Sequence, residues 1–494
     1  MVAALLVASL VSAVPLFAAS SKKADRELEA RLKAHIDILA SDDFDGREPG
    51  TDGEAKTLRY LGRQWFDIGL VSGTNDPGNE WFAPVTLVSR EPAASTAQFL
   101  RKGRKVFAPT ADLLVLTSGK RALVREAPLL FVGMGEAEDY SRTELAGRVA
   151  LLLDAGVPGS ERQNRLLEQG ASAVMTVLDS ERTLEQVSAR RKRSGYALAH
   201  DTLGGDLEAF ITRTAMDGLL KGEGKTVGAL ELAAARPDFA PSTLDLVVSL
   251  EATTRETTIR THNLIGKLPG RHPEAGAVLF LSHWDHFGEC SAPPAEDTIC
   301  NGAIDNASGV AGLTEIARRL SKGMPLDRDV YFVATTAEEL GLLGAHAFAD
   351  NPPLPVSQIV AAFNIDSIAV APRGTPFAIV GRGMTGLDAD IEKAAKAEKM
   401  RVVPGDAANE YVKRQDGWAL LQHDIPTVMV TTAYGEIERM RAFFEGDYHR
   451  PSDDLARTLD LGGAADDVKM LTALGRWFAD LRKVPRATDK SERK

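Results

Sequence analysis

VLFLSHWDHFG, from Val278 to Gly288, and CNGAIDNASGV, from Cys300 to Val310, are the stretches that decide the fold. The apolar start of the first stretch has the length and composition of a buried strand. A His-Trp-Asp-His run follows it, so an imidazole and a carboxylate stand together at the strand end. Asp305 adds a second carboxylate directly before Ala307–Leu320, which has the pattern of a helix. This order predicts a polar site at the carboxyl end of a buried strand.

Two later apolar runs end in the same way. DVYFVATTAEE ends in Glu338 and Glu339, and IVAAFNID ends in Asp366. In open α/β sheets, ligands bind in the crevice outside the carboxyl ends of the strands. The repetition therefore predicts that these acids and His283 meet in one crevice.

These motifs, together with YHRPSDD at Tyr448–Asp454, resemble in order and spacing the motifs of the M28 zinc aminopeptidases. The resemblance implies a three-layer α/β/α mixed sheet of the zinc-peptidase type. It also implies a metallo-aminopeptidase that removes N-terminal residues from peptides. The alternation of strands and helices after Thr261 by itself favours a largely parallel sheet covered by helices on both faces.

The resemblance also implies ligands for two Zn²⁺ ions. Asp305 would bridge the ions, with His283 and Asp366 completing one site and Glu339 and His449 the other. Two cations need several carboxylates to offset their charge, and a bridging carboxylate suits ions about 3.5–4 Å apart. Zinc binds His nitrogen and carboxylate oxygen, although other divalent ions accept the same ligands. Each acid taken singly has another interpretation, as a helix cap or as the partner of an arginine.

Three further residues receive catalytic roles from the resemblance. Glu338 is implied as the general base that passes a proton from the attacking water to the leaving amine. Asp285 is implied to accept the second ring N–H of His283, and Tyr448 to donate to the developing oxyanion. A packing role explains Tyr448 equally well. His286 has no ligand role in the family, and we expect an ordinary hydrogen-bonded histidine.

The segment Lys413–Trp418 departs from the family pattern. Many relatives have Ser-Asp-His in this region, and here Gly417 stands where the histidine would be. That position is not a metal ligand, so the departure weakens only the carry-over of substrate specificity. We expect Asp416 to be a carboxylate that supports the site. Aromatic residues nearby either shape an apolar pocket or belong to the core; they are Trp284, Phe287 and Trp418.

The ends and the cysteines indicate the compartment. Met1–Ser21 carries no charge and is rich in Ala, Val and Leu, which predicts a cleaved signal peptide and a periplasmic or secreted protein. An uncleaved N-terminal anchor is the alternative; after cleavage we expect no stable membrane insertion. Cys290 and Cys300 are the only cysteines, and in an oxidising compartment we expect them to pair.

A chain of 494 residues is longer than one hydrophobic core normally serves. The strings PLLFVGMG, LAGRVALLLD and LLEQGASAVMTVLD resemble the protease-associated domain, a module often inserted in this family. The expected division is a signal peptide at 1–20, catalytic domain at 21–110 and 246–485, the inserted domain at 111–245, and a disordered tail at 486–494.

The expected partners are peptides with a free N-terminus. A formal net charge of -11 argues against nucleic acid, because phosphate binding needs clustered Lys and Arg. Three alternatives stay open: a carboxypeptidase or dipeptidase of the same fold, a glutaminyl cyclase, and a non-catalytic binding protein. The intact set of five ligands disfavours a one-zinc cyclase and a protein that has lost catalysis.

Overall fold

The computed structural model describes residues 14–106, 108, 110–135, 140–154, 161–179, 182–193, 195–201, 205–291 and 295–485. Most of the predicted signal peptide and all of the predicted tail, 486–494, lie outside the described residues. The chain forms two compact units, the first made of Met1–Val85 and Arg260–Lys494 and the second of Thr86–Ile259. Among the described helices, none combines the length and apolar character needed to cross a membrane.

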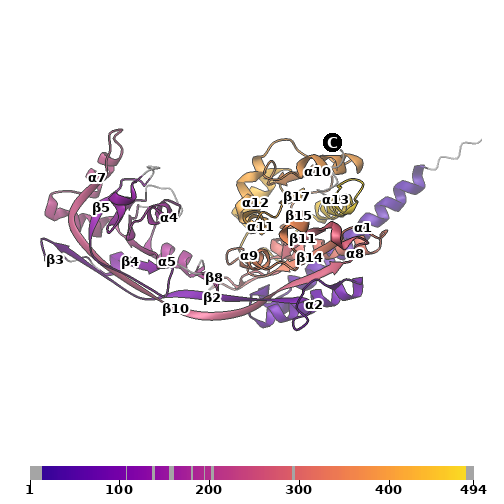
Figure 1. The fold of residues 1–494 in the computed structure, drawn as a ribbon, viewed down its shortest axis with the longest axis horizontal. Helices are drawn as coiled ribbons and strands as arrows, with labels where there is room; N and C mark the ends of the chain where they lie inside the picture. Colours follow the sequence, from indigo (N-terminus) through magenta and orange to yellow (C-terminus); the bar gives the residue numbers. More distant parts are fainter. Residues whose placement is uncertain are drawn as a thin grey trace, which may run out of the picture. The chain divides into compact units, whose positions relative to one another are not determined.

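The first unit is built on one mixed sheet (Figure 1). Its strands lie in the order β16 (Ala378–Val380), β17 (Thr427–Thr431), β15 (Ile359–Asn364), β11 (Ala277–His283), β14 (Asp329–Thr335) and the end of β10 (Ser242–Leu268). The four middle strands are mutually parallel, and the two outer ones are antiparallel to their neighbours. The predicted mixed, largely parallel sheet is confirmed.

Helices cover both faces of this sheet. Along β11, Val278 and Phe280 pack in one core, whereas Leu279 and Leu281 pack in another. Strand side chains alternate between faces, so the two cores lie on opposite sides. The first core includes residues of α1 (Val14–Leu39), α2 (Asp52–Ile68), α8 (Gly309–Ser321), α10 (Asp388–Ala397), α12 (Ile437–Gly446) and α13 (Leu461–Ala479). The second includes residues of α9 (Leu343–Asp350) and α11 (Gly417–Gln422). The three-layer prediction is therefore confirmed.

Two helix boundaries differ from the sequence-based expectation. The helix expected from Ala307 begins at Gly309, because a turn at Ala303–Ser308 precedes it and Asp305 there has φ -104 and ψ 93. The apolar periodicity of Asp467–Leu481 by itself predicts the last helix, which begins earlier, at Leu461. Two glycines in its first turn hid this start, since glycine is a poor helix former.

The second unit has its own hydrophobic core. Its parallel strands lie in the order β5 (Arg121–Phe131), β6 (Val149–Leu153), β7 (Ala173–Val177) and β9 (Leu207–Ile211). The unit is wider than the insert expected at 111–245, because β2 (Phe82–Arg101) and the first part of β10 belong to it. Its identity as a protease-associated domain stays a prediction.

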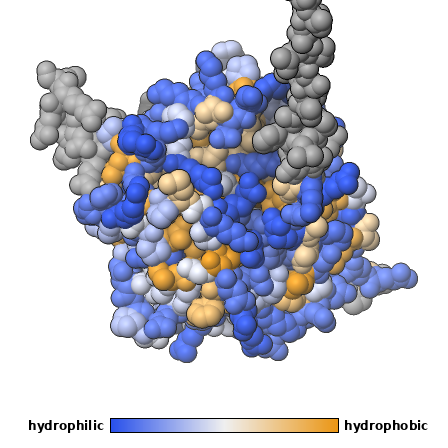
Figure 2. Space-filling view, turned by 90° about the vertical axis from the view of Figure 1, so that its right-hand side faces the viewer, coloured by the Kyte–Doolittle hydropathy of each residue, from blue (hydrophilic) through white to orange (hydrophobic). Residues whose placement is uncertain are grey.

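Large hydrophobic side chains are rarely exposed among the described residues; the most exposed are Phe66, Leu232 and Met324. The face in Figure 2 is mainly hydrophilic, with its hydrophobic residues in small groups. Single exposed hydrophobic residues are ordinary on solvated proteins. This surface therefore gives no indication of a docking site.

Candidate metal centre

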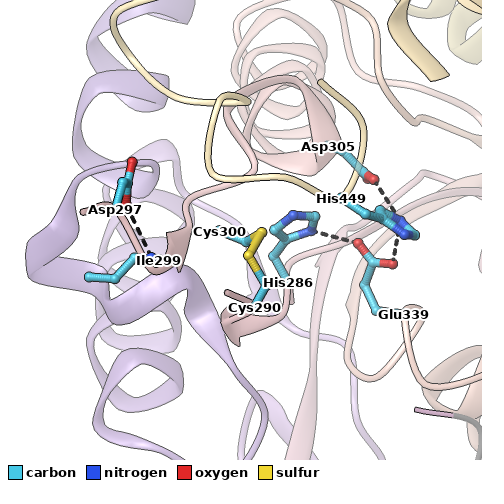
Figure 3. The surroundings of a disulfide bond; sticks show 8 residues. All are labelled: His286, Cys290, Asp297, Ile299, Cys300, Asp305, Glu339 and His449. Carbon is cyan, nitrogen blue, oxygen red and sulfur yellow. Dashed lines mark hydrogen bonds and ion pairs between the residues drawn. A yellow bond between two sulfur atoms is a disulfide. The ribbon is translucent and has the colours of Figure 1, made fainter. Parts of the chain in front are cut away.

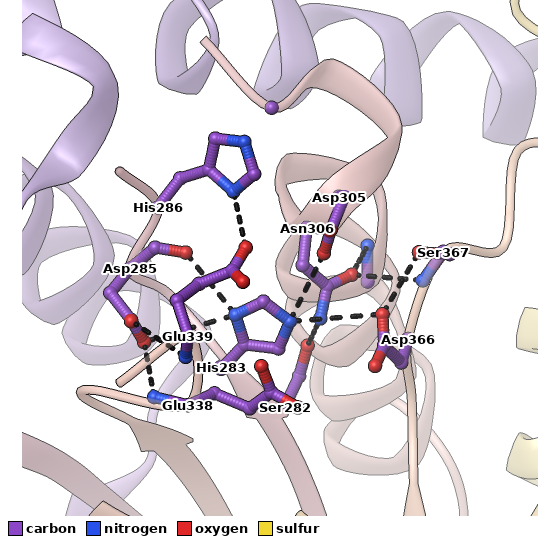
Figure 4. A network of polar contacts seen from close by, with 12 residues as sticks. Ser282, His283, Asp285, His286, Asp305, Asn306, Glu338, Glu339, Asp366 and Ser367 are labelled. Carbon is purple, nitrogen blue, oxygen red and sulfur yellow. Dashed lines mark hydrogen bonds and ion pairs between the residues drawn. The ribbon is translucent and has the colours of Figure 1, made fainter. Parts of the chain in front are cut away.

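Three predicted ligands form a closed half of the site. His283 Nε2 lies 3.3 Å from Asp305 Oδ1 and 3.7 Å from Asp366 Oδ1 (Figure 4). These residues come from the end of β11, the turn before α8 and the segment after β15. Their side chains are only 2%, 4% and 14% exposed, respectively. One imidazole and two carboxylates thus converge at the carboxyl ends of neighbouring parallel strands.

The other two predicted ligands form an open half. His449 Nε2 lies 3.4 Å from Asp305 Oδ2 and 2.9 Å from Glu339 Oε2 (Figure 3). Asp305 therefore turns one carboxylate oxygen toward each histidine, as a bridging ligand would. The His449 side chain is 32% exposed, whereas that of Glu339 is 3% exposed. Solvent reaches the site mainly on the His449 side.

The donor atoms suit a pair of divalent cations. His283 Nε2, His449 Nε2 and Glu339 Oε1 are buried, yet within the described part of the chain none makes an aligned hydrogen bond. Their distances to neighbouring acids reach ion-pair range, but their directions do not suit a hydrogen bond. Unsatisfied buried polar atoms are costly, and a metal ion would satisfy these lone pairs. The chemistry of the donor set fits zinc or a similar ion.

Crowded acids give the site a strongly perturbed electrostatic environment. Burial raises the pKa of Glu338 well above its usual value, with His283 opposing it and Glu339 adding to it. Burial likewise raises the pKa of Asp285 to about 7. For His449, burial lowers the pKa, but Glu339 and Asp305 outweigh it and raise the pKa to about 9. Such an excess of negative charge favours cations.

Asp285 supports the glutamates more directly than it supports His283. Its carboxylate accepts hydrogen bonds from the backbone N–H groups of Glu338, at 3.2 Å, and Glu339, at 3.4 Å. His283 Nδ1 lies 3.2 Å from the main-chain carbonyl oxygen of Asp285 and 3.8 Å from its carboxylate. The second ring nitrogen thus faces the carbonyl and not, as expected, the carboxylate.

Tyr448 packs directly against a ligand. Its ring stacks on that of His449, with 3.6 Å between centroids and 25° between planes. Burial raises the pKa of the Tyr448 phenol well above its usual value. The hydroxyl therefore stays protonated at neutral pH and can donate a hydrogen bond. This geometry suits both the packing role and the oxyanion role.

His286 is more than an ordinary core histidine. It is buried, and its Nδ1 lies 2.5 Å from Glu339 Oε1 (Figures 3 and 4). The opposite oxygen of Glu339 faces His449. The contact between His286 and Glu339 is within ion-pair distance but lacks the alignment of a hydrogen bond, and His286, Asp305 and Glu339 together form a group that could hold a metal ion. Gly302 makes room for this ring, because a Cβ there would lie 2.7 Å from His286 Cγ.

The predicted disulfide is confirmed. Cys290 and Cys300 are bonded, with 5.7 Å between their Cα atoms. They close the hairpin of β12 (Gly288–Glu289) and β13 (Ile299–Cys300), which runs from His286 toward the turn that holds Asp305. Figure 3 shows the bridge beside the His286 ring.

Arg47 escaped the sequence analysis. It is fully buried and donates hydrogen bonds to the main-chain carbonyls of Leu39, Trp284, Asn301 and Gly302. Burial lowers its pKa to about 10, although nearby site acids work in the opposite direction. The guanidinium ties the chain after His283 to the turn before Asp305. A charged residue inside the Gly- and Pro-rich DGREPG turn was the one available signal.

Asp453, from the YHRPSDD motif, was also not singled out. Its carboxylate accepts hydrogen bonds from the backbone N–H groups of Ile304 and Asp305, both at 3.0 Å. Burial raises its pKa to about 6, while these hydrogen bonds oppose the shift. Asp453 therefore anchors the turn that presents Asp305, the predicted bridging ligand.

The other residues singled out from the sequence either lie beside the site or pack in the hydrophobic core. Asp416 is fully buried and accepts a hydrogen bond from the Thr335 hydroxyl. Trp284 is buried in the core. The Phe287 ring lies 4.6 Å from that of His449, so it borders the open half. Trp418 is half-buried and packs against the same core as Trp284.

Parts of the chain are similar to a known protein family and to characterised proteins. Residues 263–472 match the model of Peptidase family M28. Aminopeptidase YwaD of Bacillus subtilis (strain 168) is 25% identical over 268 residues, 53% of this chain and 49% of that protein. A vacuolar membrane protease of Candida glabrata is 32% identical over 108 residues, 22% of this chain and 10% of that protein. The chain thus spans about half the length, or less, of these curated relatives.

One solved structure shares the fold over nearly the whole chain. An aminopeptidase from Aneurinibacillus sp. strain AM-1 matches with a TM-score of 0.54 at 19% identity, over 91% of this chain and 93% of that one. At this identity the likeness concerns the fold alone.

Proposed function

We propose, from the match of residues 263–472 to the model of Peptidase family M28, that the protein is a two-zinc aminopeptidase. The observation that carries the proposal is the convergence of His283, Asp305, Glu339, Asp366 and His449 on one point beside Glu338. The Bacillus relative is named an aminopeptidase, which supports the same activity.

The ligands divide the work between two ions. His283, Asp305 and Asp366 would hold one ion, and Asp305, Glu339 and His449 the other. Ions bound there would polarise the scissile carbonyl and lower the pKa of water. The acids around the site would hold the α-ammonium group of the substrate.

The protein supplies the proton transfers. Glu338 takes the proton of the attacking water and returns it to the leaving amine; its raised pKa suits this exchange. Asp285 fixes the backbone of Glu338 through a hydrogen bond. The Tyr448 hydroxyl donates to the carbonyl oxygen as negative charge develops there.

Hydrolysis of aminoacyl-p-nitroanilides tests the proposal. We expect activity that a chelator abolishes and that added zinc restores. Glu338→Gln should lower kcat by about 10²–10⁴-fold without changing the metal content. Glu398→Gln, at an exposed position of the first unit, is the matched control. Activity that is indifferent to chelation, or unchanged in Glu338→Gln, would contradict the mechanism.

Two measurements separate the alternatives. Two zinc ions per chain would exclude a one-zinc glutaminyl cyclase. N-acetylated peptides should be inert, whereas C-amidated peptides should be cleaved. The reverse pattern would indicate a carboxypeptidase.

The compartment and the second unit complete the proposal. Pairing of Cys290 and Cys300 supports export to an oxidising compartment, the periplasm or the exterior. The second unit, Thr86–Ile259, would be the protease-associated insert. None of the proposed site residues comes from it.

A further inference from the structure

A cation without a carboxylate partner in the described part of the chain borders the open half of the proposed metal centre. The guanidinium of Arg414 lies 4.4 Å from the centroid of the Phe444 ring and 5.3 Å from that of Tyr448. Tyr448 in turn stacks on the ligand His449. A row of aromatic rings therefore connects Arg414 to the metal centre.

Arg414 has no carboxylate within ion-pair distance among the residues that the structure describes. Neighbouring arginines differ in this respect: Arg441 lies 2.9 Å from Glu438 Oε1, and Arg457 lies 2.9 Å from Asp447 Oδ2. Arg414 is also solvent-exposed. It thus lies among aromatic rings and contacts the Tyr448 side chain, while no carboxylate of the described chain neutralises its charge.

The guanidinium has five N–H donors, more than its contact with Tyr448 uses. Arg414 lies over the Phe444 ring, and its planar guanidinium carries its N–H donors in the plane of the group. Such an arrangement matches the two oxygens of a carboxylate. Because these contacts have already restricted the side chain, little further conformational freedom is lost on binding.

The position of Arg414 matches the route of a substrate. The closed half is almost completely buried, and His449 is the most exposed of the ligands, at 32%. A peptide must therefore approach past His449 and its neighbour Tyr448. One extended residue spans about 3.3–3.6 Å, so a carboxylate close to the scissile bond can come near Arg414.

We propose that Arg414 binds a carboxylate of the substrate on the leaving-group side, and so favours short peptides. This inference rests on the proposed function. The carboxylate could be the free C-terminus of a dipeptide or an acidic side chain after the scissile bond. In either case the protein would prefer the charged substrate to its neutral amide.

Four peptides test the proposal and separate the two sources. Leu-Gly is compared with Leu-Gly-amide for the C-terminus, and Leu-Asp-amide with Leu-Asn-amide for the side chain. We expect kcat/KM to be about 10–100-fold higher for the charged member of at least one pair. The pair that shows the preference identifies the source.

Variants assign the preference to Arg414. Arg414→Gln should bring the ratio of the two kcat/KM values close to one, and Arg414→Glu should invert it. A merely structural role would lower both rates and leave the ratio unchanged. Arg441→Gln, which removes an arginine that already has acidic partners, should keep the wild-type ratio.

The outcomes also separate this inference from the proposed function. Wild-type protein that releases leucine from all four peptides without any preference would overturn the role of Arg414 alone. A preference that persists in both Arg414 variants would do the same. Failure to release leucine from any of the four would overturn the aminopeptidase function, and this inference with it.

Discussion

The two halves of the proposed metal centre share Asp305 but differ in construction. In the closed half, His283 and Asp366 follow neighbouring parallel strands, and their side chains are 2% and 14% exposed. In the open half, His449 comes from a loop near the C-terminus and is 32% exposed. The closed half is therefore positioned by the sheet itself. The open half depends on side-chain contacts and is the more exposed to solvent.

Replacing one histidine at a time tests most directly whether the two halves bind their ions independently. His283→Ala should lower kcat/KM by about 10³-fold or more, since several kcal/mol of charge stabilisation are lost with the buried ion. His449→Ala should lose the ion of the open half and keep the other. Metal content per chain and kcat/KM are the measurements. Loss of both ions from His449→Ala would show that the halves are not separable.

Arg47 tests why the closed half is rigid. Arg47→Met removes the donor of four buried carbonyls around His283 and Asp305. We expect the free energy of unfolding to fall by about 3 kcal/mol, measured by urea denaturation. Arg59→Met, on the exposed face of α2, should change it by less than about 0.5 kcal/mol. If the two substitutions lower the free energy of unfolding equally, the hydrogen bonds of Arg47 do not explain the rigidity of the closed half.

The comparison of the two halves also shows which features of the fold and the site could be predicted from the sequence. The apolar run Val278–Leu281 predicts a buried strand, and His283 stands at its end. Strand and predicted ligand can be recognised together because they are neighbours in the sequence. The contacts of Arg47 leave no such trace. Its carbonyl acceptors at Trp284, Asn301 and Gly302 lie 237, 254 and 255 residues away, and any residue type supplies a carbonyl.

Helix starts near the site were missed for a related reason. Asp305 lies in a turn whose shape is held by the distant Asp453. Local periodicity around Ala307 describes only the helix and not the turn that precedes it. Tertiary hydrogen bonds, which no local pattern contains, decide where α8 begins.

His286 tests the open half without removing a ligand. Because His286 contacts one oxygen of Glu339, His286→Ala should weaken the ion of the open half by about 10–100-fold. The affinity of the closed half should stay within a few-fold of wild type. Calorimetric titration of the metal-free protein with zinc resolves the two sites. Equal weakening of both sites would mean that His286 supports the whole fold and not Glu339 in particular.

The smallest expected effect is on the pH dependence of stability in the metal-free protein. Glu339 and Asp305 raise the pKa of His449 to about 9, above the usual value of about 6.5. A raised pKa means that the folded state binds the proton more tightly. This contribution is therefore complete below about pH 6.5 and is lost as the pH rises through 9.

His449→Gln should remove that part of the pH dependence. Between pH 6.5 and 9, Tm of the metal-free wild type should fall by about 2–4 °C more than that of the variant. The difference stays small because His449 is partly exposed and solvent weakens its ion pairs. His272→Gln, at an exposed position, controls for the loss of a histidine. With saturating zinc the difference should vanish in this window, because the ion then occupies the nitrogen that the proton held. If Tm of the wild type and of His449→Gln changes with pH in the same way, protonation of His449 does not stabilise the folded state. The two halves would then differ only in their exposure to solvent.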